Sequence, residues 1–207
     1  MSSDITYLLL QAAAGDLDAF DDVVRETQHD VGRFIQSLLG RSGSDEAADV
    51  AQETFLRAWR SAPTFTGSSS GRTWLFGVAR NVVADHQRRH ARRNRIRKFV
   101  SLSARRDESS DQSASVANRR DFDPADGNRF DEHYALQGLV DQLEPERKEA
   151  FVLTQIAGLS YAEVAEICEV PVGTIRSRVA RARESLALAY RLGEPDVQIP
   201  EQIPEAN

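Results

Sequence analysis

The sequence has a single cysteine, Cys168, among its 207 residues. One cysteine excludes an internal disulfide and any zinc site built from a cysteine cluster. Cys168 ends a short apolar segment, so we expect a small, packed residue there. His86 and His90 have the i, i+4 spacing of a metal pair, but no third ligand accompanies them convincingly. We therefore expect neither a metal nor any other cofactor.

Long hydrophobic runs are also missing. No stretch approaches the roughly 20 apolar residues that a membrane-spanning helix needs. The short run Tyr7–Leu10 has no Lys or Arg before it, which favours a helix over a signal peptide. These features predict a cytoplasmic protein without membrane insertion.

No segment alternates polar and apolar residues in the manner of a β-strand, whereas helical spacing recurs throughout. We predict helices over residues 16–39, 44–59, 72–93 and beyond, 145–156, 160–168 and from 171 onward. Gly40 is expected to stop the first of these, and Ser44–Glu46 to cap the start of the second. The fold class is therefore all-α.

A polar stretch rich in Ser and Asp separates two helical parts and contains too few apolar residues to fold alone. We expect a first small domain over 1–98, a flexible linker over 99–132, a second small domain over 133–192 and a disordered acidic tail over 193–207.

The net charge of −6 taken alone argues against a nucleic-acid partner, but the charge is segregated. Residues 72–98 contain nine basic residues and one acid, whereas residues 194–207 contain four acids and no base. The average therefore conceals a strongly basic helix.

Residues 171–183 predict a helix that can enter a DNA major groove. Ile175, Val179 and Ala182 form an apolar face, and the opposite face carries small residues flanked by arginines. Small side chains allow close approach while arginines reach phosphates and base edges. An arginine-rich face exposed only to water is the alternative from this helix alone.

The preceding segment favours DNA binding. Ser160 and Glu163 have the spacing of a capping box, and Pro171 suits the first turn of the next helix. A short capped helix, a tight turn and a basic amphipathic helix together predict a helix-turn-helix unit within residues 135–190.

Asp49, Gln52 and Glu53 share one face of the predicted helix 44–59. An acid-amide-acid patch can bind a basic partner helix, although a solvated polar face is the commoner reason for such a pattern.

The basic helix from residue 72 carries a mixed polar face. Trp74 has core spacing, so we expect it to pack and not to stack on a base. Amide and carboxylate groups beside arginines suit a site that bonds base edges and neutralises phosphates. The polar face comprises Arg80, Asn81, Asp85, Arg88 and Arg89.

Three motifs in order resemble the bacterial sigma factors, most closely the extracytoplasmic-function (ECF) branch that keeps only domains 2 and 4. The similarity covers about residues 15–95 and 135–190. The motifs are Asp49-x-x-Gln52-Glu53-x-Phe55-x-x-Ala58-Trp59, Thr73-Trp74-Leu75-x-x-x-Ala79-x-Asn81, and Gly158-Leu159-Ser160-Tyr161-x-Glu163-x-Ala165 with Pro171-Val172-Gly173-Thr174-x-x-Ser177-Arg178.

The resemblance implies a subunit of RNA polymerase that initiates transcription at specific promoters and is not itself an enzyme. Asp49, Gln52 and Glu53 would contact the β′ clamp coiled coil, and domain 4 would contact the β flap. The face from Arg80 to Arg89 would recognise the −10 element as a single strand, with a base held by the loop at about 65–71. The −35 duplex would be recognised by Pro171, Gly173, Thr174, Arg176, Ser177, Arg178 and Arg181. The resemblance also allows an anti-sigma factor as partner.

One residue departs from the family pattern, and two other functions stay open. Glu169 stands where the family usually has glycine, at a cost of up to about 1 kcal/mol if its backbone is left-handed. A dimeric helix-turn-helix regulator would explain residues 135–190 but not the Asp49–Glu53 patch. A metal-dependent hydrolase using His86 and His90 would require bound zinc.

Overall fold

The computed structural model describes residues 4–104 and 137–193, and across these ranges every regular element is a helix, as predicted. The first part contains α1 (Ile5–Ala13), α2 (Leu17–Leu39), a 3₁₀ helix (Arg41–Glu46), α3 (Ala47–Ser61), a 3₁₀ turn (Ala62–Thr64) and α4 (Gly71–Ala104). In the second part residues 137–141 are helical and precede α6 (Pro145–Gln155), α7 (Tyr161–Cys168) and α8 (Val172–Gly193).

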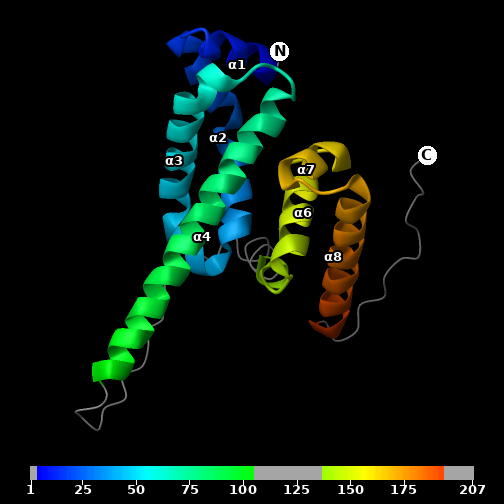
Figure 1. The fold of residues 1–207 in the computed structure, drawn as a ribbon. Helices are drawn as coiled ribbons and strands as arrows, with labels where there is room; N and C mark the ends of the chain where they lie inside the picture. Colours follow the sequence, from blue (N-terminus) through cyan, green and yellow to red (C-terminus); the bar gives the residue numbers. More distant parts are fainter. Residues whose placement is uncertain (1–3, 105–136, 194–207) are drawn as a thin grey trace, which may run out of the picture.

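The first part is built from α2, α3 and α4, which run alongside one another, with α1 crossing one end (Figure 1). Its core includes Phe34 and Phe76, whose rings meet edge to face with centroids 5.2 Å apart. Leu9 on α1 is fully buried against this core. Trp74 packs at the edge of the core with its ring centroid 5.4 Å from that of Phe65, consistent with the predicted packing role.

The ends of α2 confirm one prediction, whereas the start of α3 corrects another. Asp16 caps α2 by accepting a hydrogen bond from the Ala19 amide at 3.1 Å, and Gly40 ends the helix with φ of 71°. No side chain of Ser44–Glu46 caps α3, because these residues form the end of the 3₁₀ helix that precedes it. The N-cap of α3 is Glu46, whose side chain makes no capping hydrogen bond.

The second part packs α6 and α7 against α8 around Val152, Leu153, Val164, Ile175 and Val179, all of which are buried. Cys168 is also buried, as expected for a small packed residue. The α8 face that the sequence assigned to the core is therefore the one that packs.

The long helix α4 continues to Ala104, so it extends past the domain boundary expected at residue 98. Figure 1 shows its C-terminal half projecting away from the rest of the first part. The remainder of the expected linker, residues 105–132, lies outside the described residues, as does the expected acidic tail from residue 194.

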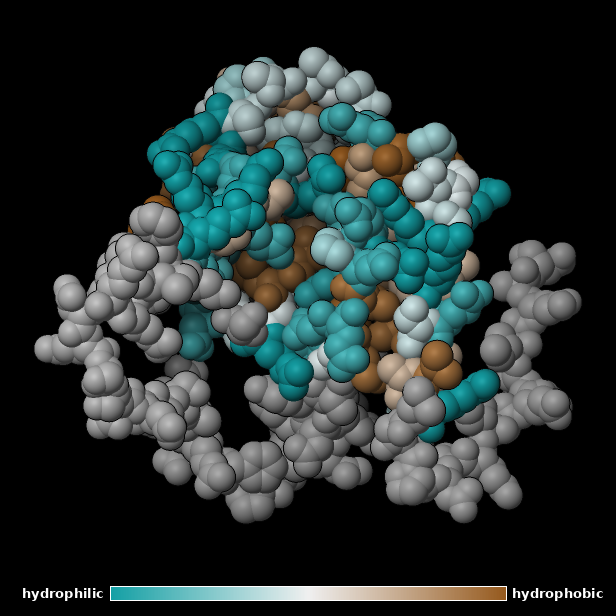
Figure 2. All heavy atoms as spheres, turned by 60° about the horizontal axis from the view of Figure 1, so that its bottom comes forward, coloured by the Kyte–Doolittle hydropathy of each residue, from teal (hydrophilic) through white to brown (hydrophobic). Residues whose placement is uncertain are grey.

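The two parts are in contact. The side formed by α6 and α7 packs against α2 and α4, and Figure 1 shows α7 beside the N-terminal half of α4. Figure 2 shows that hydrophobic surface lies in a hollow on one face of the molecule, with hydrophilic side chains around it. The sequence predicted the helices of both parts but not this packing.

Candidate functional site

The helix-turn-helix unit is formed by α7, the turn at residues 169–171 and α8. Ser160 and Glu163 make the predicted capping box, in which the Glu163 amide donates to Ser160 Oγ at 3.3 Å and the Ser160 amide donates to Glu163 Oε2 at 2.9 Å. Glu169 has φ of 55° and ψ of 42°, a left-handed conformation that turns the chain toward α8. The predicted capping box is confirmed, whereas Pro171 lies just before α8 and not in its first turn.

The predicted duplex-binding face of α8 lies opposite its packed face. Ile175 and Val179 are buried, whereas Thr174 and Arg178 are half-buried. The remaining side chains of the predicted set are exposed: Pro171, Gly173, Arg176, Ser177 and Arg181. The structure therefore places Pro171 just before α8 and the other six residues on the N-terminal half of α8, where most of their small and basic side chains are exposed.

The five predicted residues of α4 are divided between two environments. Arg80 is half-buried and donates from Nε to Glu149 Oε1 on α6 at 2.7 Å, and Asn81 lines a cavity of about 250 Å³ together with Glu166 and Ile167 of α7. Asp85, Arg88 and Arg89 lie farther along α4, where Asp85 accepts from Arg88 at 2.6 Å. In this arrangement the structure does not bring the five residues into one open surface.

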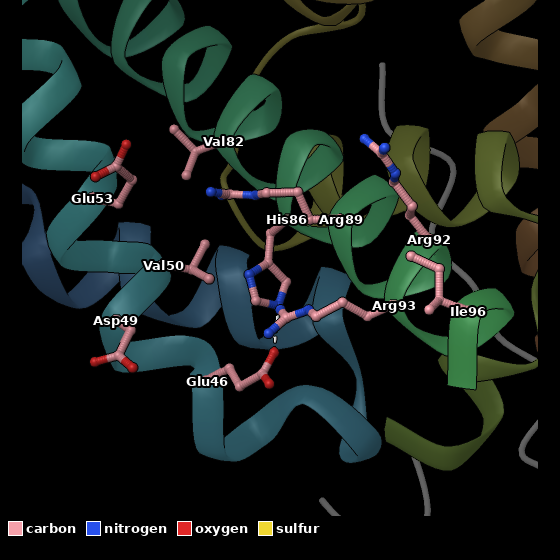
Figure 3. Close-up of a pocket in the computed structure, with 10 residues that line it drawn as sticks. All are labelled: Glu46, Asp49, Val50, Glu53, Val82, His86, Arg89, Arg92, Arg93 and Ile96. Carbon is pink, nitrogen blue, oxygen red and sulfur yellow. Dashed lines mark hydrogen bonds and ion pairs between the residues drawn. The ribbon is translucent and has the colours of Figure 1, made fainter. Parts of the chain in front are cut away.

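A groove of about 760 Å³ separates α3 from α4 (Figure 3). Glu46, Asp49 and Glu53 lie along one wall, and Arg89, Arg92 and Arg93 extend from α4 along the other. Val50 and Val82 lie between the two walls. The groove thus has an acidic wall and a basic wall on either side of an apolar floor.

Asp49 and Gln52 are exposed beside this groove, and Glu53 is half-buried. The structure therefore places all three predicted residues on α3, with Asp49 and Glu53 lining the groove.

Arg57 joins two sites that the sequence treated separately. Its Nε donates to Glu53 Oε1 and its Nη1 to Asp85 Oδ2, both at 2.7 Å. Its hydrogen bonds lower the pKa of both carboxyl groups, and those two carboxylates raise the pKa of Arg57. The i, i+4 spacing of Glu53 and Arg57 was available in the sequence, but the contact with Asp85 depends on how α3 packs on α4.

The two histidines considered for metal binding have other contacts. His86 Nε2 pairs with Glu46, and His90 Nδ1 lies 3.3 Å from the side-chain amide of Asn94. Among the described residues, no group of three or more His, Cys, Asp or Glu side chains is arranged to hold a metal ion.

No helix in the described ranges is both long enough and apolar enough to cross a membrane.

Both parts of the chain match sigma-factor families. The model of Sigma-70 region 2 matches residues 14–93, and the model of Sigma-70, region 4 matches residues 133–186. The chain is 40% identical over 186 residues to the ECF RNA polymerase sigma factor SigC of Mycobacterium tuberculosis, an alignment covering 88% of this chain and 89% of that protein. It is 30% identical over 188 residues to the ECF RNA polymerase sigma-E factor of Escherichia coli, covering 90% and 95%.

Solved structures agree with this similarity. The sigma factor RpoE of Bartonella quintana, solved with the anti-sigma factor NepR, is 25% identical with a TM-score of 0.61, over 86% of this chain and all of that one. CnrH, solved with the cytosolic domain of CnrY, shares the fold with a TM-score of 0.67 at 22% identity, over 93% of this chain and all of that one. The chain therefore belongs to the ECF branch of the sigma-70 family and is a sigma factor that directs RNA polymerase to promoters.

Proposed function

We propose that three surfaces of this sigma factor divide promoter recognition and polymerase binding among them. The exposed N-terminal face of α8 binds the −35 duplex, the polar face of α4 binds the −10 strand, and the exposed polar face of α3 binds core polymerase. The observation that carries the division is that these side chains lie on three different helices, each anchored by a separate buried face.

The α8 face suits duplex DNA because Gly173 and Ser177 permit close approach while Arg176 and Arg181 remain exposed for phosphates and base edges. The α4 face suits a separated strand, since Asn81 can bond base edges and Arg88 and Arg89 can neutralise phosphates. Strand binding offsets the few kcal/mol that unstacking costs. No residue in this scheme acts as a catalyst.

The α3 face supplies the contact with the β′ clamp coiled coil through Asp49, Gln52 and Glu53, and the second part supplies the contact with the β flap. Joining two weak DNA contacts through one polymerase raises the effective concentration of each. Because core polymerase and chromosome are the partners, we place this activity in the cytoplasm. The Bartonella quintana relative also supports an anti-sigma factor as a regulatory partner.

Replacing Glu53 by lysine tests the α3 surface. The variant Glu53→Lys puts a positive charge where a basic partner helix would bind, so we expect affinity for core polymerase to fall on the order of tenfold. Gel filtration of the full chain with core polymerase measures the loss of co-elution, and circular dichroism verifies that the helices remain.

The matched control is Asp21→Lys, which makes the same charge change at an exposed position of α2. Equal co-elution of Glu53→Lys and Asp21→Lys would contradict the assignment of the α3 surface.

A further inference from the structure

The basic wall of the groove between α3 and α4 is not neutralised by the rest of the described chain. Arg57 and Arg88 each pair with Asp85, but Arg92 and Arg93 form no ion pair with any described residue. Both side chains are exposed, and both line the groove. The wall therefore presents two guanidinium groups that can bind carboxylates of a partner.

The groove side of α4 is a continuous stripe of which only the first half is packed. Val82 is buried, and His86 pairs with Glu46. Figure 1 shows the C-terminal half of α4 projecting past α3, and this half includes Arg93 and Ile96, of which Ile96 is 55% exposed. The stripe residues recur at alternating spacings of four and three, which keep them on one side of the helix. They are Val82, His86, Arg89, Arg93 and Ile96.

The acidic wall limits what can lie in the groove. Asp49 and Glu53 line the α3 side, and a nucleic-acid strand would place its phosphates beside their carboxylates, where like charges repel. A partner with only basic side chains would be repelled by Arg92 and Arg93 in the same way. A protein helix can carry acids along one edge, bases along the other and apolar residues between them. The groove therefore fits an amphipathic helix with two oppositely charged edges.

The length of the stripe suits such a helix. Val82 and Ile96 are 14 positions apart, so at about 1.5 Å per residue the stripe is roughly 21 Å long. A partner helix of about four turns follows this whole length. Figure 3 shows Arg93 and Ile96 on the opposite side of the groove from Asp49 and Glu53.

We infer that the core-polymerase site proposed for α3 continues across the groove to α4, where Arg93 and Ile96 bind the same helix of the partner. Acidic side chains of that helix lie against Arg93, apolar ones against Ile96, and basic ones against Asp49 and Glu53. This inference rests on the proposed role of α3. It adds a basic and apolar half to a site that the sequence placed on α3 alone.

The test measures the affinity of fluorescently labelled full-length protein for core polymerase, without DNA, by fluorescence anisotropy. We expect Arg93→Glu to bind on the order of tenfold more weakly, because a carboxylate of the partner then meets a like charge. Arg93→Lys keeps the positive charge and should bind within about twofold of wild type. Circular dichroism verifies that the helices remain in each variant.

Arg95→Glu is the matched control, because Arg95 is exposed on the same helix and does not line the groove. We expect it to bind core polymerase as wild type does. The apolar contact is tested by Ile96→Ser, which should weaken binding about fivefold. Its control is Leu17→Ser, which removes a side chain that is 64% exposed at the start of α2 and should leave the affinity unchanged.

The outcomes separate this inference from the proposed function. If Arg93→Glu and Ile96→Ser match their controls while Glu53→Lys loses affinity, α4 is not part of the site and the role of α3 stands alone. If Glu53→Lys also keeps full affinity, the role of α3 fails and the inference fails with it. If Arg93→Glu weakens binding of a single-stranded DNA of random sequence and leaves core affinity unchanged, the groove binds a strand and the inference is wrong.

Discussion

At the scale of single residues, Glu169 has a strained backbone conformation within the helix-turn-helix unit. It is the only residue other than glycine with positive φ in the described ranges, at 55°. A side chain with a Cβ is strained in this conformation, which glycine adopts without penalty. The sequence showed that glutamate replaces the usual glycine, and the structure shows that the backbone keeps the left-handed turn.

Replacing Glu169 by glycine should therefore stabilise the protein. We expect Glu169→Gly to raise the free energy of unfolding by about 0.5–1 kcal/mol, because the strain disappears while the turn is retained. Thermal denaturation followed by circular dichroism measures the change. The control is Glu166→Gly in the middle of α7, which should destabilise by about 1 kcal/mol. Stabilisation by both variants, or by neither, would contradict the strain at residue 169.

The contacts of Arg57 show why the sequence predicted only part of the site. Glu53 and Arg57 are one helical turn apart, so their pairing could be inferred from the sequence. Asp85 is 28 positions away from Arg57, and their contact depends on the packing of α3 against α4. Short-range spacing identifies residues that pair within one helix, but it does not show which residues of other helices they contact.

At the scale of elements, the start of α4 depends on a close approach to α1. A Cβ at Gly71 would lie 2.8 Å from backbone atoms of Ile5 and Thr6, and the Gly71 amide donates to Thr6 Oγ1 at 3.0 Å. Backbone atoms at this distance cannot move aside without shifting α1. The sequence placed Gly71 in a loop next to a predicted helix, and only the packing of α1 explains why glycine is needed there.

Substituting alanine at Gly71 should therefore disturb the packing of α1 against the start of α4. We expect Gly71→Ala to lower the free energy of unfolding by about 1–3 kcal/mol, measured by urea denaturation. Gly77→Ala is the control on the same helix, because a Cβ at Gly77 meets no atom within 4 Å. That variant should be neutral or stabilising by up to about 1 kcal/mol. A Gly71→Ala protein as stable as wild type would show that α1 shifts freely.

At the scale of the whole molecule, the sequence predicted the main helices and the helix-turn-helix unit, and every candidate residue except Pro171 lies on the helix predicted for it. It did not predict that Arg80 pairs with Glu149 of α6, or that Asn81, which stays exposed, borders α7. Helix periodicity and caps are local signals, whereas the pair Arg80–Glu149 joins residues 69 positions apart. Charge segregation revealed a strongly basic helix, but nothing local showed that one of its arginines would pair with a carboxylate of the same chain.

Glu163 connects the stability of the whole molecule to pH, because it caps α7 and also binds α4. Partial burial raises the pKa of Glu163, but hydrogen bonds from Thr73, the Ser160 amide and the hydroxyls of Ser160 and Ser70 outweigh that effect and lower it to about 2, from an ordinary value of 4.5. A depressed folded-state pKa means that the unfolded chain binds the proton more readily. The stabilisation by Glu163 is therefore complete above about pH 4.5 and is lost as the pH falls toward 2.

We expect Glu163→Gln to be less stable than wild type near neutral pH and the difference to shrink as the pH falls from about 4.5 toward 2, because glutamine can still serve the capping box but carries no charge to lose. Urea denaturation at a series of pH values measures the difference in the free energy of unfolding between the two proteins. The titration of the other carboxylates does not contribute to this difference, because both proteins contain them. Glu166→Gln, an exposed position on the same helix, is the control and should track wild type. A gap between Glu163→Gln and wild type that stays constant from neutral pH to pH 2 would mean that the charge of Glu163 does not fasten the two parts together.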